Sequence, residues 1–320
     1  MANTIGISTA VGNTYTDPGT YYNKVWLEQL MPQLVLENCG QKMPLPKNSG
    51  TLMKFHRVNK ITAPSALPTL ASYLLTENTN PTETTLGTTA VSVEPLSYGQ
   101  WVKVSRELKL KSVNPVMKEF TKTLADEAAV VYEEIIRAQL TANSTNQFAG
   151  GAANEAAVAD ASTLTASEVR KGVYTLRKAG VPGFERGMYK LAASPAGVFD
   201  IFADSAAGSY VDLKKYTDPS NLERGEVGQL YGTRVIQGTQ LGTGTGATDE
   251  TFHAYLFGKD AFGISELSGD GMGVIMKEPG SQDTSNPLDR FSTVGWHFTM
   301  AAKVLQAARV VKIMHGTAAE

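Results

Sequence analysis

The amino-acid sequence predicts an α+β fold, in which helices and strands are interleaved along the chain. Apolar residues at helical spacing run from Asn114 to Asn143, and stretches rich in β-branched and aromatic residues stand on both sides of them. From residue 165 onward, helix signals and strand signals alternate. These observations indicate mixed helix and sheet, and they leave the order of strands within a sheet open.

The stretch from Asn114 to Asn143 is expected to form one long amphipathic helix. Asn114 suits the N-cap, Pro115 suits the first helical position, and no glycine or further proline interrupts the run. About 30 residues at a rise of about 1.5 Å each span roughly 45 Å, so we expect this helix to act as the spine of the molecule. Its apolar face is predicted to consist of Val116, Phe120, Leu124, Val131, Ile135 and Ala138.

The chain before this helix is expected to contain an arm, a short helix and two strands. Residues 1–17 are polar and offer little to bury, which predicts an arm that is mobile or ordered only by a partner. An apolar stripe over Tyr21 to Glu37 predicts a helix. The stretches Thr51 to Asn59 and Ala90 to Ser105 predict strands.

The segment between these two strands, Ile61 to Thr89, is rich in threonine and proline and has no clear period. One interpretation is an arm built on two strands, whose tip packs on another molecule so that its apolar residues become buried only after assembly. Ordinary sheet with a weak pattern is the alternative. The residues of this segment that we expect in contacts between subunits are Pro64, Leu67, Leu70, Tyr73 and Leu74.

The chain after the spine helix is expected to hold two more helices and several strands. Thr165 and Glu168 are spaced as a capping box for a helix that ends at Gly180, and Ser194 and Pro195 open another helix. The other predicted elements are a loop or hairpin at 145–161, a helical turn at 226–230, and strands at 189–193, 233–239, 252–257, 262–267, 272–277, 295–300 and 304–313.

Composition and charge exclude several classes of protein. The 320 residues carry a formal net charge of −2, which gives no electrostatic reason for tight binding to nucleic acid or to an anionic membrane as the main activity. Cys39 is the only cysteine, which rules out an internal disulfide and a multi-thiolate metal site. Residues 1–20 lack the features of a secretory signal, and no apolar run is long enough to predict a membrane span.

No pattern in the sequence predicts a catalytic site, a cofactor site or a metal site. The four histidines do not have the spacing of a metal site. Glu133 and Glu134 are expected on a solvated helix face, because adjacent helical residues project about 100° apart. The glycine-rich stretch Leu241 to Thr251 lacks the lysine of a phosphate loop and predicts a hairpin tip, while Ser268 to Gly271 predicts a turn.

The densest group of positive residues lies just before the spine helix. It consists of Lys103, Arg106, Lys109 and Lys111, with Glu94, Glu107 and Glu119 nearby. Charges of both signs indicate a contact surface more readily than a track for DNA. We therefore expect Trp101, Lys103 and Arg106 to take part in contacts between subunits.

Short stretches spread over most of the chain carry a resemblance to a known family. They are Leu30 to Leu34 (LMPQL), Gly99 to Ser105 (GQWVKVS), Gly225 to Val235 (GEVGQLYGTRV), and Asn286 to Arg290 (NPLDR) followed by Thr293 to His297 (TVGWH). In these stretches and in its order of elements, the chain resembles the major capsid proteins of tailed bacteriophages, which share the HK97-type fold. More narrowly, it resembles the N4 gp56-like major capsid family, in which Asp is commoner at the position of Asn286.

The resemblance implies a division of the chain into named parts. They are an N-terminal arm and short helix at 1–50, an extended E-loop at 51–105, a P-domain at 106–162 around the spine helix 114–143, an A-domain at 163–290, and terminal strands at 291–320 that return to the P-domain. In that fold the E-loop lies across a neighbouring subunit. This agrees with the arm inferred above from the prolines and apolar residues.

The resemblance also implies a function and partners. The implied function is that of a non-enzymatic major capsid protein, which self-assembles as hexamers and pentamers into an icosahedral phage head around double-stranded DNA without sequence-specific binding. The implied partners are further copies of the chain, a separate scaffolding protein, a portal and decoration proteins, with no membrane. A separate scaffolding protein is expected because the P-domain and E-loop features begin within about 50 residues of Met1. The implied location is the virion capsid, after assembly in the host cytoplasm.

Two alternatives to a phage head stay open at this point. One is an encapsulin-like compartment of the same fold, which stores cargo and lacks a packaged genome. The other is an enzyme or binding module with a site in the A-domain.

Overall fold

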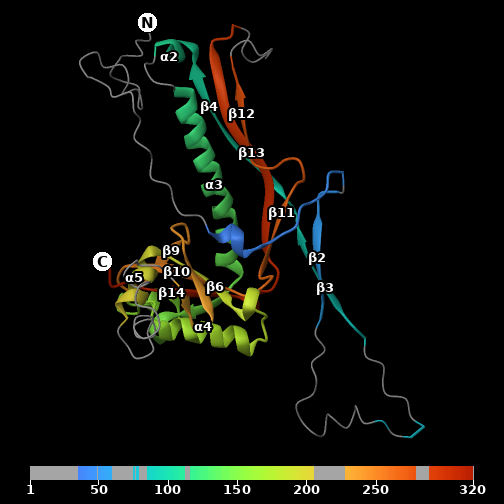
Figure 1. Ribbon diagram of the computed structural model, residues 1–320, viewed down its shortest axis with the longest axis vertical. Helices are drawn as coiled ribbons and strands as arrows, with labels where there is room; N and C mark the ends of the chain where they lie inside the picture. The colour runs from blue at the N-terminus through green and yellow to red at the C-terminus, as the bar shows by residue number, and fades with distance from the viewer. Residues whose placement is uncertain are drawn as a thin grey trace.

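The computed structural model describes residues 35–48, 50–59, 75, 77–78, 85–111, 116–204, 228–278 and 288–319. One long helix lies beside a sheet of long strands, a second sheet with its own helices lies at one end of that helix, and a hairpin projects to the side (Figure 1). This arrangement confirms the predicted α+β class.

The long helix is α3, which spans Val116–Asn143 and confirms the predicted spine. Its buried face is rotated by about one residue from the predicted face, because Val131 and Ile135 are only half-buried and Ala138 is exposed. The most deeply buried apolar residues instead recur every four positions: Leu124, Ala128, Tyr132, Ile136 and Leu140. Tyr132 is not part of the predicted apolar face, yet it belongs to the row of buried residues that packs on the first sheet.

The first sheet is built around one strand of 14 residues. Its members are β1 (Gln41–Lys42), β4 (Leu96–Ser105), β11 (Phe262–Glu266), β12 (Gly273–Lys277) and β13 (Phe291–Val304). The central strand β13 pairs with β4 along one edge and with β11 and β12 along the other. The predicted strand at 295–300 is therefore too short at both ends. The predicted strand at 304–313 begins too early, because η6 (Ala307–Arg309) comes before β14 (Val310–His315).

The single strand predicted at 90–105 is two strands in the structure. Strand β3 (Thr88–Val93) pairs with β2 (Met53–Val58), while β4 begins at Leu96 and pairs with β13. Pro95 stands at the break, where a residue without an N–H group cannot continue a ladder. A short helix that the sequence did not predict, α2 (Arg106–Lys111), follows β4.

The second sheet forms the core of the lower part of the molecule in Figure 1. Its strands are β5 (Thr145–Phe148), β6 (Tyr189–Ala193), β7 (Gln229–Leu230), β8 (Thr233–Gln237), β9 (Thr243–Thr245), β10 (Glu250–Phe257) and β14. On β10, Ala254 and Leu256 pack with the helices α4 (Ala166–Lys178) and α5 (Pro195–Ala203), whereas Tyr255 and Phe257 pack with α3. The alternation of side chains along β10 thus joins the two cores.

Several local predictions for this part of the chain are confirmed and others are wrong. The predicted loop at 145–161 contains β5 and two 3₁₀ turns, η3 (Ala149–Gly151) and η4 (Glu155–Ala157), and the predicted helical turn ends in strand β7. The glycine-rich stretch forms the hairpin between β9 and β10, as predicted. The predicted helix at 21–37 lies almost wholly outside the described residues, which begin just before η1 (Leu36–Cys39).

The two predicted helix starts had different outcomes. The Ser194 Oγ accepts the N–H of Gly197 at 3.1 Å, which confirms the N-cap of α5. At α4 the predicted capping box does not form, because the side chain of Thr165 makes no cap hydrogen bond. Asp204 instead accepts the N–H of Ala166 at 3.1 Å, so the carboxylate at the end of α5 caps α4.

Candidate functional site

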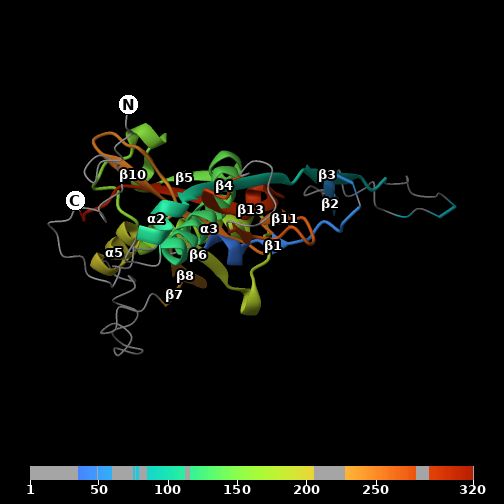
Figure 2. The ribbon, with the colours of Figure 1, turned by 90° about the horizontal axis from the view of Figure 1, so that it is seen from above.

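The hairpin of β2 and β3 projects away from both sheets (Figures 1 and 2). Within the described chain, these two strands pair only with each other. Along β2, Lys54, His56 and Arg57 are exposed, and Val58 is 63% exposed. A two-stranded hairpin by itself is marginally stable in water, so its base must be held by the rest of the molecule.

The base of the hairpin is attached at Phe55, which is buried against β11. A Cβ atom added to Gly263 would lie 2.6 Å from Cζ of Phe55, so only glycine leaves room for the ring. On the same strand, the Ser265 hydroxyl donates to Sδ of Met53 at 3.2 Å. These contacts fix one end of the hairpin to the first sheet. At the other described end of the hairpin, Arg57 to Asn59 line a cleft of about 310 Å³ together with residues 179–182, Gln306 and Arg309.

The face of the first sheet that points away from α3 carries a groove between two exposed apolar side chains. On β13, Trp296 and its inward neighbours pack toward α3, whereas Gly295 faces outward. Gly295 lies opposite Trp101 on β4 and opposite Ile275 on β12. Trp101 is 64% exposed and Ile275 is 48% exposed. Because Gly295 has no side chain, a groove of about 420 Å³ runs between them.

Strand β12 adds an open apolar edge to this face. One side of β12 pairs with β13, and no described strand pairs with the other side. Its three apolar residues Val274, Ile275 and Met276 are all exposed. An exposed, apolar edge strand is a template for contact with another chain.

The predicted contact residues Lys103 and Arg106 continue the exposed strip that begins at Trp101. Lys103 lies two residues further along β4, on the same face, with its Nζ 3.7 Å from the centroid of the Phe291 ring. Arg106 is the first residue of α2 and is also exposed. The structure therefore brings three of the predicted contact residues together. The other five, Pro64, Leu67, Leu70, Tyr73 and Leu74, lie outside the described residues.

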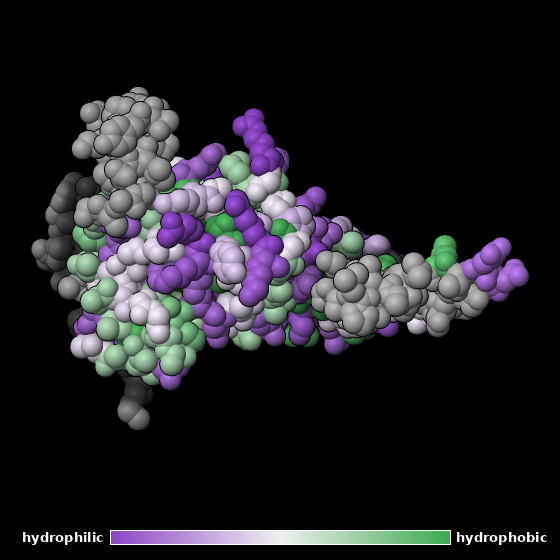
Figure 3. Space-filling view, turned by 90° about the horizontal axis from the view of Figure 1, so that it is seen from below, coloured by the Kyte–Doolittle hydropathy of each residue, from purple (hydrophilic) through white to green (hydrophobic). Residues whose placement is uncertain are grey.

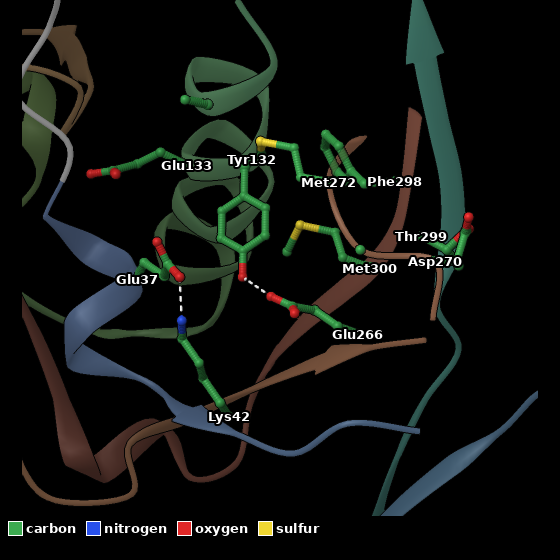
Figure 4. Close-up of a pocket in the computed structure, with 12 residues that line it drawn as sticks. Glu37, Lys42, Tyr132, Glu133, Glu266, Asp270, Met272, Phe298, Thr299 and Met300 are labelled. Atoms are coloured by element: carbon green, nitrogen blue, oxygen red, sulfur yellow. Dashed lines mark hydrogen bonds and ion pairs between the residues drawn. The ribbon is translucent and has the colours of Figure 1, made fainter. Parts of the chain in front are cut away.

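A cleft of about 340 Å³ lies between the N-terminal segment, α3 and the first sheet (Figure 4). Four carboxylates line it, those of Glu37, Glu133, Glu266 and Asp270. Each one already has a partner in the structure: Lys42 for Glu37, the backbone at Val35 and Leu36 for Glu133, the hydroxyl of Tyr132 for Glu266, and His297 and Thr299 for Asp270. These pairings connect separate segments of the chain and make the cleft a structural junction.

Glu133 corrects the prediction of a solvated helix face. Only 2% of this residue is exposed, and its Oε1 accepts the N–H groups of Val35 at 2.8 Å and Leu36 at 3.1 Å. Burial raises the pKa of this carboxyl group, while the two backbone donors act in the opposite direction. The neighbouring Glu134 instead binds the Arg137 guanidinium. Sequence reasoning missed Glu133, since its partners lie almost a hundred residues away.

The buried titratable groups give no sign of a nucleophile. Burial raises the pKa of the Cys39 thiol to about 11, which keeps it protonated and unreactive near neutral pH. His253 is 3% exposed, and its Nε2 lies 2.6 Å from Oε1 of Glu155, so this buried ring is paired with a partly exposed carboxylate. Among the described residues, no group of three or more His, Cys, Asp or Glu is placed to hold a metal ion. No helix in the same ranges has the length and apolar character of a membrane span.

Comparison with known proteins reveals similarity in three-dimensional structure. No protein-family model matches this sequence, and no curated protein matches it significantly. Among solved structures, "Cyanophage Pam1 capsid asymmetric unit" superimposes with a TM-score of 0.72 at 14% identity and covers 100% of both chains. "Capsid of Ralstonia phage GP4" has a TM-score of 0.70 at 14% identity and covers 97% of both chains.

A third similar structure is titled "Mycobacterium phage Che8". It has a TM-score of 0.68 at 17% identity, covering 92% of this chain and 96% of the other. Matches of this length place the projecting hairpin, the long helix and both sheets in one common architecture. The chain therefore has the HK97-like fold of phage capsid proteins.

Proposed function

We propose that this protein is a major capsid protein, which self-assembles as hexamers and pentamers into an icosahedral phage head that encloses double-stranded DNA. The observation that carries the proposal is full-length similarity to phage capsid structures, together with surfaces that a single copy leaves uncovered. The protein would act as a structural subunit rather than as an enzyme. It would be assembled in the host cytoplasm and reside in the virion capsid.

The uncovered surfaces support association between copies. The exposed side chains of Trp101 and Ile275 lie on one face of the first sheet, and Val274 and Met276 are exposed on the edge strand β12. Contiguous apolar surface of this kind is buried in complexes, where each Å² removed from water contributes roughly 25 cal/mol. The hairpin of β2 and β3 has the extended shape that reaches a neighbouring molecule (Figure 2).

We assign the parts of the chain on the same basis. The E-loop would comprise 51–105, with β2 and β3 as its stalk, and the spine helix and the terminal strands would belong to the P-domain. The A-domain would comprise 163–290 around the second sheet. An arm that reaches a neighbouring subunit would explain the apolar residues of the segment 61–89, because the neighbour would bury them. Pro64, Leu67, Leu70, Tyr73 and Leu74 would make contacts from its tip.

We further infer the partners and the narrower family. The sequence stretches GQWVKVS at 99–105 and TVGWH at 293–297 support the N4 gp56-like major capsid family. Both stretches include residues that line the groove beside Gly295. The partners would be a separate scaffolding protein, a portal and decoration proteins, and DNA bound without regard to sequence.

The first test removes the projecting segment. Deletion of residues 61–89 should leave subunits that are soluble and folded, because none of the described residues of this segment (75, 77–78 and 85–89) belongs to a strand of either sheet of the body. This variant should no longer form shells, as measured by electron microscopy and size-exclusion chromatography of the purified protein. Shells of normal size and stability from the deletion variant would contradict the role of this segment as a contact between subunits.

The second test changes one side chain on the exposed face. Trp101→Ala should reduce shell yield while the circular dichroism of the subunit stays unchanged, since the indole is mostly in solvent in a single copy. Phe199→Ala on α5 is the matched control, because Phe199 is also an exposed aromatic residue, at 52%. Equal loss of shells in both variants would show that exposed aromatic area in general, and not the groove, drives assembly.

The contents of the particle distinguish the alternatives. Particles isolated from infected cells should contain nuclease-protected double-stranded DNA of uniform length. Shells that carry a protein cargo and no genome would favour an encapsulin-like compartment. A small species that persists at high protein concentration would favour an enzyme or binding module.

A further inference from the structure

The solvent-facing side of α4 is positively charged. Arg170, Arg177 and Lys178 are exposed, and none of the three has a carboxylate within ion-pair distance among the described residues. The one acidic residue of this helix, Glu168, is buried and pairs with Lys171 at 2.6 Å. The exposed side of α4, here called the α4 patch (Arg170, Arg177 and Lys178), therefore carries charge of a single sign.

Aromatic rings and a tight turn hold this patch in place. The Arg170 guanidinium lies 5.8 Å from the centroid of the Tyr231 ring, and Lys178 Nζ lies 6.0 Å from that of Tyr174. Nη2 of Arg177 approaches the turn at Gly232. Ring contacts orient a cation without neutralising it, so the charge stays available to a partner. Hydrophilic side chains gather in the middle of the surface seen from the end where α4 lies (Figure 3).

Acidic side chains collect at the hairpin between β9 and β10. Asp249 and Glu250 are exposed there, and Asp160 is half-exposed in the segment bound to the hairpin through the Ala247 N–H and the Val158 carbonyl, at 2.9 Å. Within the described chain, no cation pairs with any of these three carboxylates. The hairpin patch (Asp160, Asp249 and Glu250) therefore matches the α4 patch in size and is opposite in sign.

The two patches lie on opposite sides of one domain. The α4 helix runs along the lower side of the second sheet in Figure 1, while the β9–β10 hairpin stands at its upper side. Because both are attached to the same sheet, the patches cannot meet within one chain. Contact between one patch and the other on the next copy is heterologous, and repetition of such a contact by rotation closes a ring.

The geometry points to a head-to-tail contact in which the α4 patch of one copy binds the hairpin patch of the next copy around a ring. This inference rests on the proposed function and names a contact within its rings. Nucleic acid would neutralise the positive charge of the α4 patch alone, whereas contact with a second copy neutralises the charges of both patches. Exposed ion pairs contribute little affinity, and their role here is to set the register and the speed of association.

A charge-exchange experiment with the full-length protein tests this contact. The double variant Arg170→Glu/Arg177→Glu should slow assembly about tenfold at low salt, as measured by light scattering and native mass spectrometry of nuclease-treated protein. Asp249→Lys/Glu250→Lys should have the same effect. The variant that combines all four changes should recover the rate of the natural chain to within about twofold. Lys303→Glu, an exposed reversal on β13 outside both patches, is the control that should change little.

The outcomes separate this contact from the proposed function. All the changed side chains are exposed, so circular dichroism and thermal unfolding should match those of the natural chain. Normal assembly by both double variants, or no recovery in the combined variant, would overturn the contact while shells still form. A normal assembly rate of the nuclease-treated protein together with weaker binding of added double-stranded DNA, seen only for the α4 reversal, would also overturn it and assign the α4 patch to nucleic acid. Failure of the natural chain to form shells even when the proposed scaffolding protein is supplied would instead count against the proposed function.

Discussion

The second sheet and the outward face of the first sheet differ in the solvent exposure of their large apolar side chains. In the second sheet, Tyr255 and Phe257 are completely buried and lie stacked with their ring centroids 6.1 Å apart. On the first sheet, Trp101 and Ile275 are exposed on either side of a glycine. Burial in the first case stabilises the fold of a single copy. The exposed pair contributes almost nothing until another molecule covers it.

The largest effect on stability should come from removing one of the buried aromatic rings. Phe257→Ala removes a fully buried ring that contacts Phe262 at a centroid distance of 5.5 Å, and should lower the free energy of unfolding by about 3–5 kcal/mol. Chemical denaturation of the unassembled protein measures this change. A loss below about 1 kcal/mol would mean that the two cores do not depend on this ring.

The next effect should appear as a pH dependence of stability. His315 is fully buried, and burial lowers its pKa to about 4 from the ordinary value of 6.5. Below pH 6.5 the unfolded chain gains a proton at this residue and the folded chain does not, so stability should fall by about 3 kcal/mol between pH 6.5 and pH 4. His315→Gln should flatten this part of the curve. His56→Gln, on the exposed hairpin, should leave it unchanged.

A smaller effect should follow from the junction between the N-terminal segment and α3. Glu133→Ala leaves two backbone N–H groups without their acceptor and should cost about 1–3 kcal/mol of unfolding free energy. Hydrogen exchange at Val35 and Leu36 should accelerate together with this loss. Glu134→Ala is the matched neighbour on the helix, and should cost less than about 0.5 kcal/mol because its pair with Arg137 is a partly exposed ion pair within one helical turn.

The smallest effect on stability should come from the exposed side of the comparison. Ile275→Ser on β12 should change the unfolding free energy of a single copy by less than about 0.5 kcal/mol, because much of this side chain is already in water. Its effect should appear in the yield of shells instead. A large loss of stability in the unassembled protein would show that the edge of β12 is covered by its own chain.

The sequence was most informative where a pattern depends only on neighbouring residues. The spine helix, strand β6 and the N-cap at Ser194 were predicted because spacing and capping are local. The division of β3 from β4 was missed because it depends on which strands they join. The buried face of α3 was predicted about one residue away from its true position, because Tyr132 and Glu133 have partners far away in the sequence.

The candidate site was predictable in part and for a similar reason. Trp101, Lys103 and Arg106 were identified from composition and from the resemblance, and the structure places them along one exposed strip. The groove itself was missed, because it needs Gly295 and Ile275 brought into register from other strands. Contacts by the residues between Pro64 and Leu74 stay predictions.

The attachment of the projecting hairpin at Phe55 has a mechanical consequence. A ribbon of two strands attached beside β11, at Gly263 and Ser265, behaves as a lever with its pivot at that strand. A small rotation there becomes a large displacement at the far end, at little cost to the packed cores. In the proposed shell, identical chains would then reach neighbours at unequal separations, as the different curvatures around fivefold and sixfold axes would demand.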